Sequence, residues 1–165
     1  SLELIMAKKL SPEDIPRWTS FLNQAAVPLL SVAPNLRQRA AQSKTHFGIR
    51  IAPWVTADLC LTPEGVKVRV LSNNPRAIDL FEYFKVNQQE IELAIGMHLP
   101  ADGWSDSGEK QRSFSTPIVR SADLEIASTR EEAENQWFID VVIRLSAVIR
   151  KLVEQFKQED KGKIF

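Results

Sequence analysis

Two acidic residues and a lysine lie close together in the stretch DLCLTPEGVKVRV, which runs from Asp58 to Val70. Metal-dependent nucleases carry acidic residues and a lysine on strands in a similar arrangement, where the carboxylates hold the metal ion. The alternative is a β-hairpin whose turn contains Glu64. Only the spacing of these residues separates a catalytic centre from a turn.

The spacing favours the hairpin. TPEG, residues 62–65, has proline at the second place and glycine at the fourth, which are the preferences of a type I turn. With this loop, Asp58 faces Arg69 on the outward side, a cross-strand charge pair worth about 0.2–1 kcal/mol. The same register pairs Leu61 with Val66, Cys60 with Lys67 and Leu59 with Val68.

The metal site needs a different geometry. Its second acid and its lysine must stand two positions apart on one strand, because alternate side chains point to the same face. Here Glu64 and Lys67 stand three positions apart with Gly65 between them. We therefore predict no metal site and no catalytic residue in this stretch.

Other residues offer little for catalysis. His46 and His98 are the two histidines, and neither has a cysteine or an acid at ligand spacing, which disfavours a zinc site. Cys60 is the single cysteine; Lys67 would lower its pKa, but a packed, idle thiol is the favoured interpretation. The six glycines form no phosphate-binding loop. We expect no cofactor.

Basic residues form the remaining candidate site. Arg50, Lys67 and Arg69 belong to the polar face of the expected sheet, and Arg37 and Arg39 belong to the connection before it. If the outer face is open, these residues merge into a patch that contacts phosphates. The alternative is an ordinary solvated surface, since acidic residues lie among them. Trp54 and Trp104 either stack on a base or a partner, or fix their loops onto the core.

These residues are positioned by strands with a period of two. Residues 47–52, 55–61 and 66–70 alternate apolar and polar side chains, which is typical of half-buried strands. A further strand is expected within residues 112–120, at a sheet edge because Pro117 lacks an N–H.

Three helices are expected around the sheet. The first begins near Ser11 and ends before Pro28 or passes it with a kink. The second is capped by Asn74, has Pro75 at its first position and ends at Gly96. The third covers residues 128–163, and both Ser128–Glu131 and Thr129–Glu132 have the spacing of a capping box.

The 165 residues therefore predict one α+β domain, with a small antiparallel sheet of three to four strands packed against three helices, the C-terminal one long. We assign residues 1–10 to a linker or remnant, 11–158 to the domain and 159–165 to a flexible tail. Acidic and basic residues balance at 21 each, so nucleic acid would need a local patch. The lone cysteine fits the cytoplasm, and no apolar run suits a membrane helix.

The order of elements resembles a known family. The chain is similar to the bacterial and archaeal domain of unknown function 4268 in the order of its segments. These are WTSFLNQA, HFGIRIA, a hairpin, AIDLFEYFKVNQQEIELAIGMHL, a tryptophan loop and QWFIDVVIRLSAVIRKLVEQF. The similarity covers residues 11–156, mostly at core positions. In that family a V-x-V-x-L strand precedes a helix ending in an EIE and LG pattern, as EIELAIG does here. The insertion ADGWSDSGEKQ places Trp104 later than the family pattern.

The resemblance implies a context rather than a chemistry. Such domains commonly follow an N-terminal half with a PD-(D/E)XK nuclease-like fold. The resemblance would fit a chain that starts at Ser1 as a piece of a longer protein, and a processed form is the alternative. We therefore expect a non-catalytic accessory module of a nuclease-like or defence-related bacterial protein, which binds DNA, the upstream nuclease-like domain or a partner subunit. The alternative is a structural domain that forms a homodimer through its sheet edge or long C-terminal helix. An enzyme is the third hypothesis.

Overall fold

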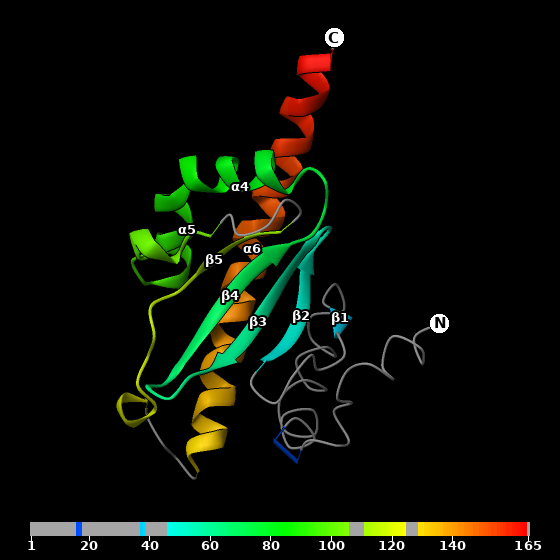
Figure 1. Cartoon of the computed structure of the whole chain (residues 1–165). Coiled ribbons are helices and arrows are strands. Elements are labelled where there is room, and N and C mark those ends of the chain that lie inside the picture. Colours follow the sequence, from blue (N-terminus) through cyan, green and yellow to red (C-terminus); the bar gives the residue numbers. More distant parts are fainter. Residues whose placement is uncertain (1–15, 18–36, 39–45, 106–110, 125–128, 165) are drawn as a thin grey trace.

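The computed structural model describes residues 16–17, 37–38, 46–105, 111–124 and 129–164 of the chain. They form an α+β domain, as the sequence predicts, built on a five-stranded antiparallel sheet backed by the long last helix (Figure 1). The strands follow one another across the sheet in chain order: β1 (Arg37–Gln38), β2 (His46–Ala52), β3 (Val55–Leu61), β4 (Val66–Ser72) and β5 (Arg112–Ser115). The two-residue β1 was not expected.

The hairpin of β3 and β4 has the predicted register. Asp58 is the partner of Arg69, and Leu61 is the partner of Val66. The Thr62 N–H donates to the Gly65 carbonyl at 2.8 Å and closes the four-residue loop. Because this loop and the alternation of apolar residues agree on one register, the hairpin is specified locally.

Alternation separates the sheet into two faces. The inner face is apolar and fully buried, and it consists of Phe47, Ile49, Ala57, Leu59, Val66, Val68, Val70 and Phe114. The opposite side, which we call the polar face, carries His46, Gly48, Arg50, Thr56, Asp58, Cys60, Lys67, Arg69, Leu71, Ser113 and Ser115. The first set forms the core. In the second set Thr56, Asp58, Cys60, Leu71 and Ser115 are also buried, so the side chains most available to a ligand are those of His46, Arg50, Lys67, Arg69 and Ser113.

The fourth predicted strand is β5, and it is an edge strand as predicted. Regular pairing stops at Ser115, two residues before Pro117. Beyond the proline, Val66 and Val119 form an isolated bridge in which each N–H donates to the other's carbonyl, at 2.9 and 2.8 Å. The interruption follows from the missing N–H of proline.

The single helix predicted between Asn74 and Gly96 is wrong: the structure has two helices, α4 (Ala77–Val86) and α5 (Gln88–Ile95). They separate at Asn87, whose side-chain Nδ2 donates to the Tyr83 carbonyl at 2.8 Å. The backbone N–H of Asn87 is shared between the carbonyls of Tyr83 at 3.2 Å and Phe84 at 3.1 Å, which is the tightened turn with which helices often end. The predicted stop is confirmed, since Gly96 has φ 71°.

The start of α4 also differs from the prediction. Asn74 does not cap the helix; its Oδ1 accepts the Arg76 N–H at 2.8 Å, and its carbonyl accepts the Ala77 N–H. This is the side-chain turn that asparagine forms before a helix. Asn74, Pro75 and Arg76 therefore form a turn, and the helix begins two residues later than expected.

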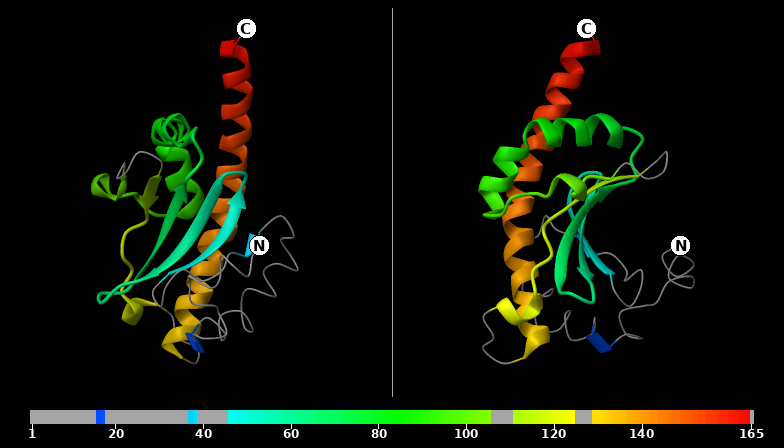
Figure 2. Two further views of the ribbon diagram at one scale, coloured as in Figure 1. Left: turned by 45° about the vertical axis from the view of Figure 1, so that its right-hand side comes forward. Right: turned by 60° about the vertical axis from the view of Figure 1, so that its left-hand side comes forward.

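The long C-terminal helix is confirmed as α6 (Arg130–Ile164), which has 35 residues and a length of about 50 Å. Thr129 caps the start of α6, because its Oγ1 accepts the Glu132 N–H at 3.1 Å; the other candidate, Ser128, lies outside the described residues. Figure 2 shows α6 passing behind the sheet and extending beyond it. None of the helices within the described residues has an apolar stretch sufficient to cross a membrane.

Helices and sheet meet in one core. The α4 rings of Phe81 and Phe84 lie 6.0 and 6.2 Å from the ring of Phe114 on β5, centre to centre. From α6, Phe138, Leu145 and several other apolar side chains are fully buried. The first predicted helix lies outside the described residues, except for the helical Pro16 and Arg17.

Candidate functional site

Asp58, one of the two acidic residues considered for metal binding, is occupied by an ion pair. Its Oδ2 lies 3.1 Å from Nη2 of Arg69, and the residue is 2% exposed. Gly48 stands opposite on β2, and its missing side chain leaves room for the carboxylate. Glu64 is exposed in the hairpin loop. The two carboxylates therefore belong to different surroundings, as the hairpin requires.

A hollow of about 500 Å³ lies beside this ion pair, along β4 and β5. Its size falls in the usual range of ligand pockets. Lys67 and Arg69 line it from β4, and hydroxyl groups line it from the edge strand and the loops. The lining residues are Lys67, Arg69, Pro100, Asp102, Gly103, Ser105, Gln111, Ser113, Ser115, Thr116, Pro117 and Ile118. We call this hollow the β4–β5 groove.

The groove presents donors that are not used internally. Within the described part of the chain, the Lys67 ammonium has no carboxylate at ion-pair distance, and the hydroxyls of Ser113 and Ser115 make no side-chain hydrogen bond. Among the same residues, the Arg69 guanidinium pairs with Asp58, and its buried Nε finds no acceptor. Such a set of cationic and hydroxyl donors suits an anionic, oxygen-rich ligand.

The serines were missed by sequence reasoning. Arg69 is the register partner of Ser115, and Leu71 that of Ser113, so both serines belong to the polar face. The period-two spacing of Ser113 and Ser115 around the buried Phe114 was the available signal. Their position beside Lys67 and Arg69 depends on the β4–β5 pairing, which joins residues more than 40 positions apart.

Two titratable groups on the polar face respond to these cations. Burial lowers the pKa of His46, and the charges of Arg69 and Lys67 lower it further. Burial also raises the pKa of Cys60 to about 11, although Arg69 and Lys67 oppose that rise. The Cys60 thiol is 2% exposed and protonated at neutral pH, so the idle interpretation of this cysteine is supported.

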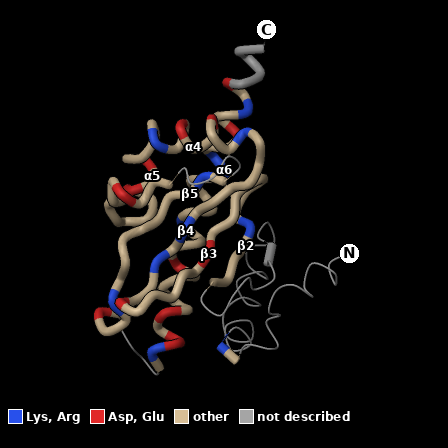
Figure 3. The backbone as a smooth tube through the Cα atoms, in the orientation of Figure 1, with Lys and Arg blue, Asp and Glu red and all other residues tan. Residues whose placement is uncertain are grey.

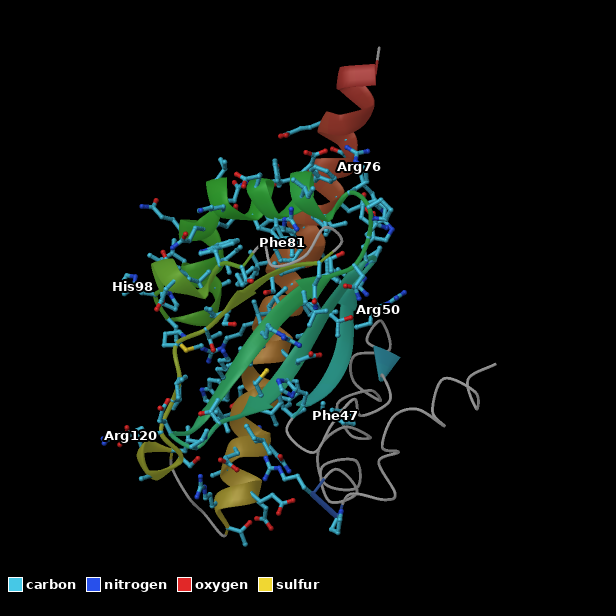
Figure 4. The ribbon with its side chains drawn as sticks, viewed as in Figure 1. Phe47, Arg50, Arg76, Phe81, His98 and Arg120 are labelled. Carbon is cyan, nitrogen blue, oxygen red and sulfur yellow. The ribbon has the colours of Figure 1, made fainter. Side chains whose placement is uncertain are left out.

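The other basic candidates lie further along the sheet. Arg50 is exposed on the polar face, and Figure 4 shows its side chain extending from β2 away from the core. Arg37 on β1 is its register partner. Arg39 lies outside the described residues. Figure 3 shows basic positions on β2 and β4 with an acidic position on β3, the strand between them.

The two loop tryptophans differ in position. Trp104 packs on Phe114 with ring centres 4.8 Å apart and fixes its loop onto the core. Trp54 ends the turn between β2 and β3 with φ 72°, a left-handed conformation that costs a residue with a side chain about 1–2 kcal/mol. The Lys157 ammonium of α6 lies over its ring, 5.1 Å from the centre. Strained backbone positions cluster at functional sites, so the partly exposed Trp54 side chain is a candidate for ligand contact.

Among the residues that the structure describes, no three His, Cys, Asp or Glu side chains are grouped so as to hold a metal ion. Comparisons with models of protein families, with curated proteins and with solved structures find no significant match to this chain. The resemblance to domain of unknown function 4268 therefore stays a prediction.

Proposed function

We propose that this domain is a non-catalytic accessory module of a nuclease-like or defence-related bacterial protein, and that it binds nucleic acid through the polar face of its sheet. The observation that carries this proposal is the β4–β5 groove. Lys67, Arg69 and the hydroxyls of Ser113 and Ser115 gather there around a hollow of about 500 Å³. Cations and hydroxyls are the side-chain groups that most often contact phosphate and sugar.

The absence of a catalytic role in the proposal has its own support. Asp58 is buried in its pair with Arg69, and the Cys60 thiol has a pKa of about 11. A thiol with so high a pKa is not poised as a nucleophile near neutral pH, and the Asp58 carboxylate is engaged by Arg69. The chain has no net charge, so the local donors rather than a global field would attract the phosphates.

The test is a titration of the protein into labelled DNA, followed by fluorescence anisotropy at several salt concentrations. We expect binding at low salt that weakens as salt rises, because phosphate contacts release counterions. Lys67→Ala should weaken binding about fivefold and reduce the salt slope by roughly one.

The matched control is Arg144→Ala, which removes an exposed cation from α6, the helix behind the sheet. It should leave both affinity and salt slope unchanged. Equal losses in Lys67→Ala and Arg144→Ala would show that binding is unspecific. A complete lack of binding at low salt would remove the nucleic-acid proposal.

A second candidate function, a homodimer, is favoured by an apolar surface at the junction of α4 and α5. Val86 is 83% and Leu93 is 85% exposed, and a hollow of about 490 Å³ runs beside Leu93 and Met97. This surface lies on the short helices rather than on the sheet edge or α6. Uncovered apolar side chains of this size often mark a protein contact.

Light scattering over a range of concentrations tests this candidate. A dimer that uses this surface should dissociate in the variant Leu93→Glu, because a carboxylate would be buried without a partner. Arg50→Ala, which changes an exposed residue of β2 rather than of α4 or α5, serves as the control. A monomer at every concentration of the unchanged protein would discard the dimer.

A further inference from the structure

A second hollow lies on the same sheet face, further along β4. It has a volume of about 200 Å³, and it is lined by Arg50, Trp54, Thr56, Leu71, Ser72, Asn73 and Asn74. Leu71 follows Arg69 by two positions, and residues two apart on a strand face the same side roughly 6.6 Å from one another. The two hollows therefore succeed each other along one strand.

This second hollow is built around an aromatic ring. Trp54 holds a left-handed conformation that glycine would adopt without strain, so its side chain is the feature that the turn retains. The Trp54 side chain packs partly against the core, and the Lys157 ammonium of α6 lies over its ring. The volume is smaller than that of a usual small-molecule pocket, so it suits one flat ring of a larger ligand.

Polar groups surround the ring. Arg50 and Asn73 are exposed at the rim of the hollow. Asn74 uses its Oδ1 for the Arg76 N–H, and its Nδ2 makes no hydrogen bond within the described residues. Side-chain amides beside an aromatic ring are the groups that contact the edges of an unpaired base.

We infer that the polar face takes single-stranded rather than duplex nucleic acid. The strand would lie along β4, with its phosphates in the β4–β5 groove near Lys67 and Arg69, and with one base on Trp54. Bases within a duplex are stacked on each other and cannot reach an aromatic side chain, whereas those of a single strand can. This inference rests on the proposed function, and it adds the class of nucleic acid.

The test compares a labelled single strand of 12 thymidines, a duplex of the same length and inorganic polyphosphate as competitor. The unchanged protein should bind the single strand more tightly than the duplex. Trp54→Leu should weaken single-strand binding about fivefold or more, because base stacking is lost, and should leave the polyphosphate affinity unchanged. Trp54→Phe should retain part of the single-strand affinity.

Fluorescence supplies a measurement that does not depend on the leucine variant folding. The chain has four tryptophans, so the difference between the unchanged protein and Trp54→Phe reports on Trp54 alone. We expect the single strand to quench this difference signal and the polyphosphate to leave it unchanged.

Failure of the inference and failure of the proposed function are distinguishable. Equal affinity for duplex and single strand, with no quenching of Trp54, would overturn the inference and leave nucleic-acid binding in place. Absence of binding to both ligands at low salt would overturn the two together.

Discussion

Replacing Glu134 by alanine should lower the free energy of unfolding by about 3–5 kcal/mol, the usual result of removing one partner of a buried ion pair. Glu134 is near the start of α6 and its side chain is 7% exposed. Its Oε1 lies 3.2 Å from Nη1 of Arg17, whose side chain is 16% exposed. Chemical denaturation followed by circular dichroism measures the loss.

The cost arises because Glu134 joins separate segments. The Ser121 hydroxyl donates to its carboxylate, Arg130 lies at 3.5 Å, and Nη2 of Arg17 donates to the neighbouring Asn135 at 3.0 Å. Burial lowers the pKa of Arg17, and Glu134 opposes this effect. Without Glu134, a buried guanidinium would lose its nearest carboxylate.

Two variants check that explanation. Asp140→Ala removes an exposed carboxylate from the same helix and should change stability by less than about 0.5 kcal/mol. Adding Arg17→Met to Glu134→Ala should recover part of the loss, because the guanidinium that lost its nearest carboxylate is then gone as well. If the free energy of unfolding of Glu134→Ala lies within about 1 kcal/mol of that of the unchanged protein, the ion pair does not hold the segments together.

Gly65→Ala should be destabilising by about 2–5 kcal/mol. A Cβ added at Gly65 would collide with the Val119 carbonyl group. It would lie 2.8 Å from the carbonyl carbon of Val119 and 2.9 Å from Cα of Arg120. These are backbone atoms, so the hairpin loop would have to move away from the chain after β5. That movement breaks the two hydrogen bonds between Val66 and Val119, and it adds overpacking strain.

The neighbouring residue provides the control. Glu64→Ala changes an exposed loop residue and should be neutral within about 0.5 kcal/mol. Hydrogen exchange at the amides of Val66 and Val119 should accelerate in Gly65→Ala and stay slow in Glu64→Ala. An unchanged melting temperature for Gly65→Ala would mean that the close approach to Val119 is not maintained in solution.

The functional proposals share one physical basis. Asp58 neutralises part of the charge of Arg69, and the groove lining also contains the acidic Asp102. The positive charge that would meet a phosphate in the β4–β5 groove therefore comes mainly from Lys67. Arg69 lines the groove, and Leu71, two positions later on β4, lines the second hollow. Under the proposal, the two hollows give the polar face two kinds of contact, one for phosphates and one for a base. Binding experiments with Lys67 and Trp54 variants therefore address different parts of the same ligand.

The sequence by itself determined the parts that depend on neighbours along the chain. The register of β3 and β4, with Asp58 against Arg69, follows from a four-residue loop between two alternating segments. The extent of α6 follows from its apolar spacing. The end of α5 follows from the residue type at Gly96, because glycine adopts the observed φ of 71° without strain. Each is a local choice among a few backbone conformations, which residue type biases strongly.

The tertiary structure decided what depends on distant segments. The sequence shows Gly65 as a turn residue. It does not show that the backbone carbonyl of Val119 lies where a side chain at position 65 would be. The break at Asn87 is accompanied by a shared backbone N–H and a side-chain hydrogen bond, which helical spacing does not reveal. The β4–β5 groove exists because Ser113 and Ser115 pair with a strand more than 40 residues earlier. Such contacts are selected by the packing of the whole chain, so periodicity and turn preferences cannot supply them.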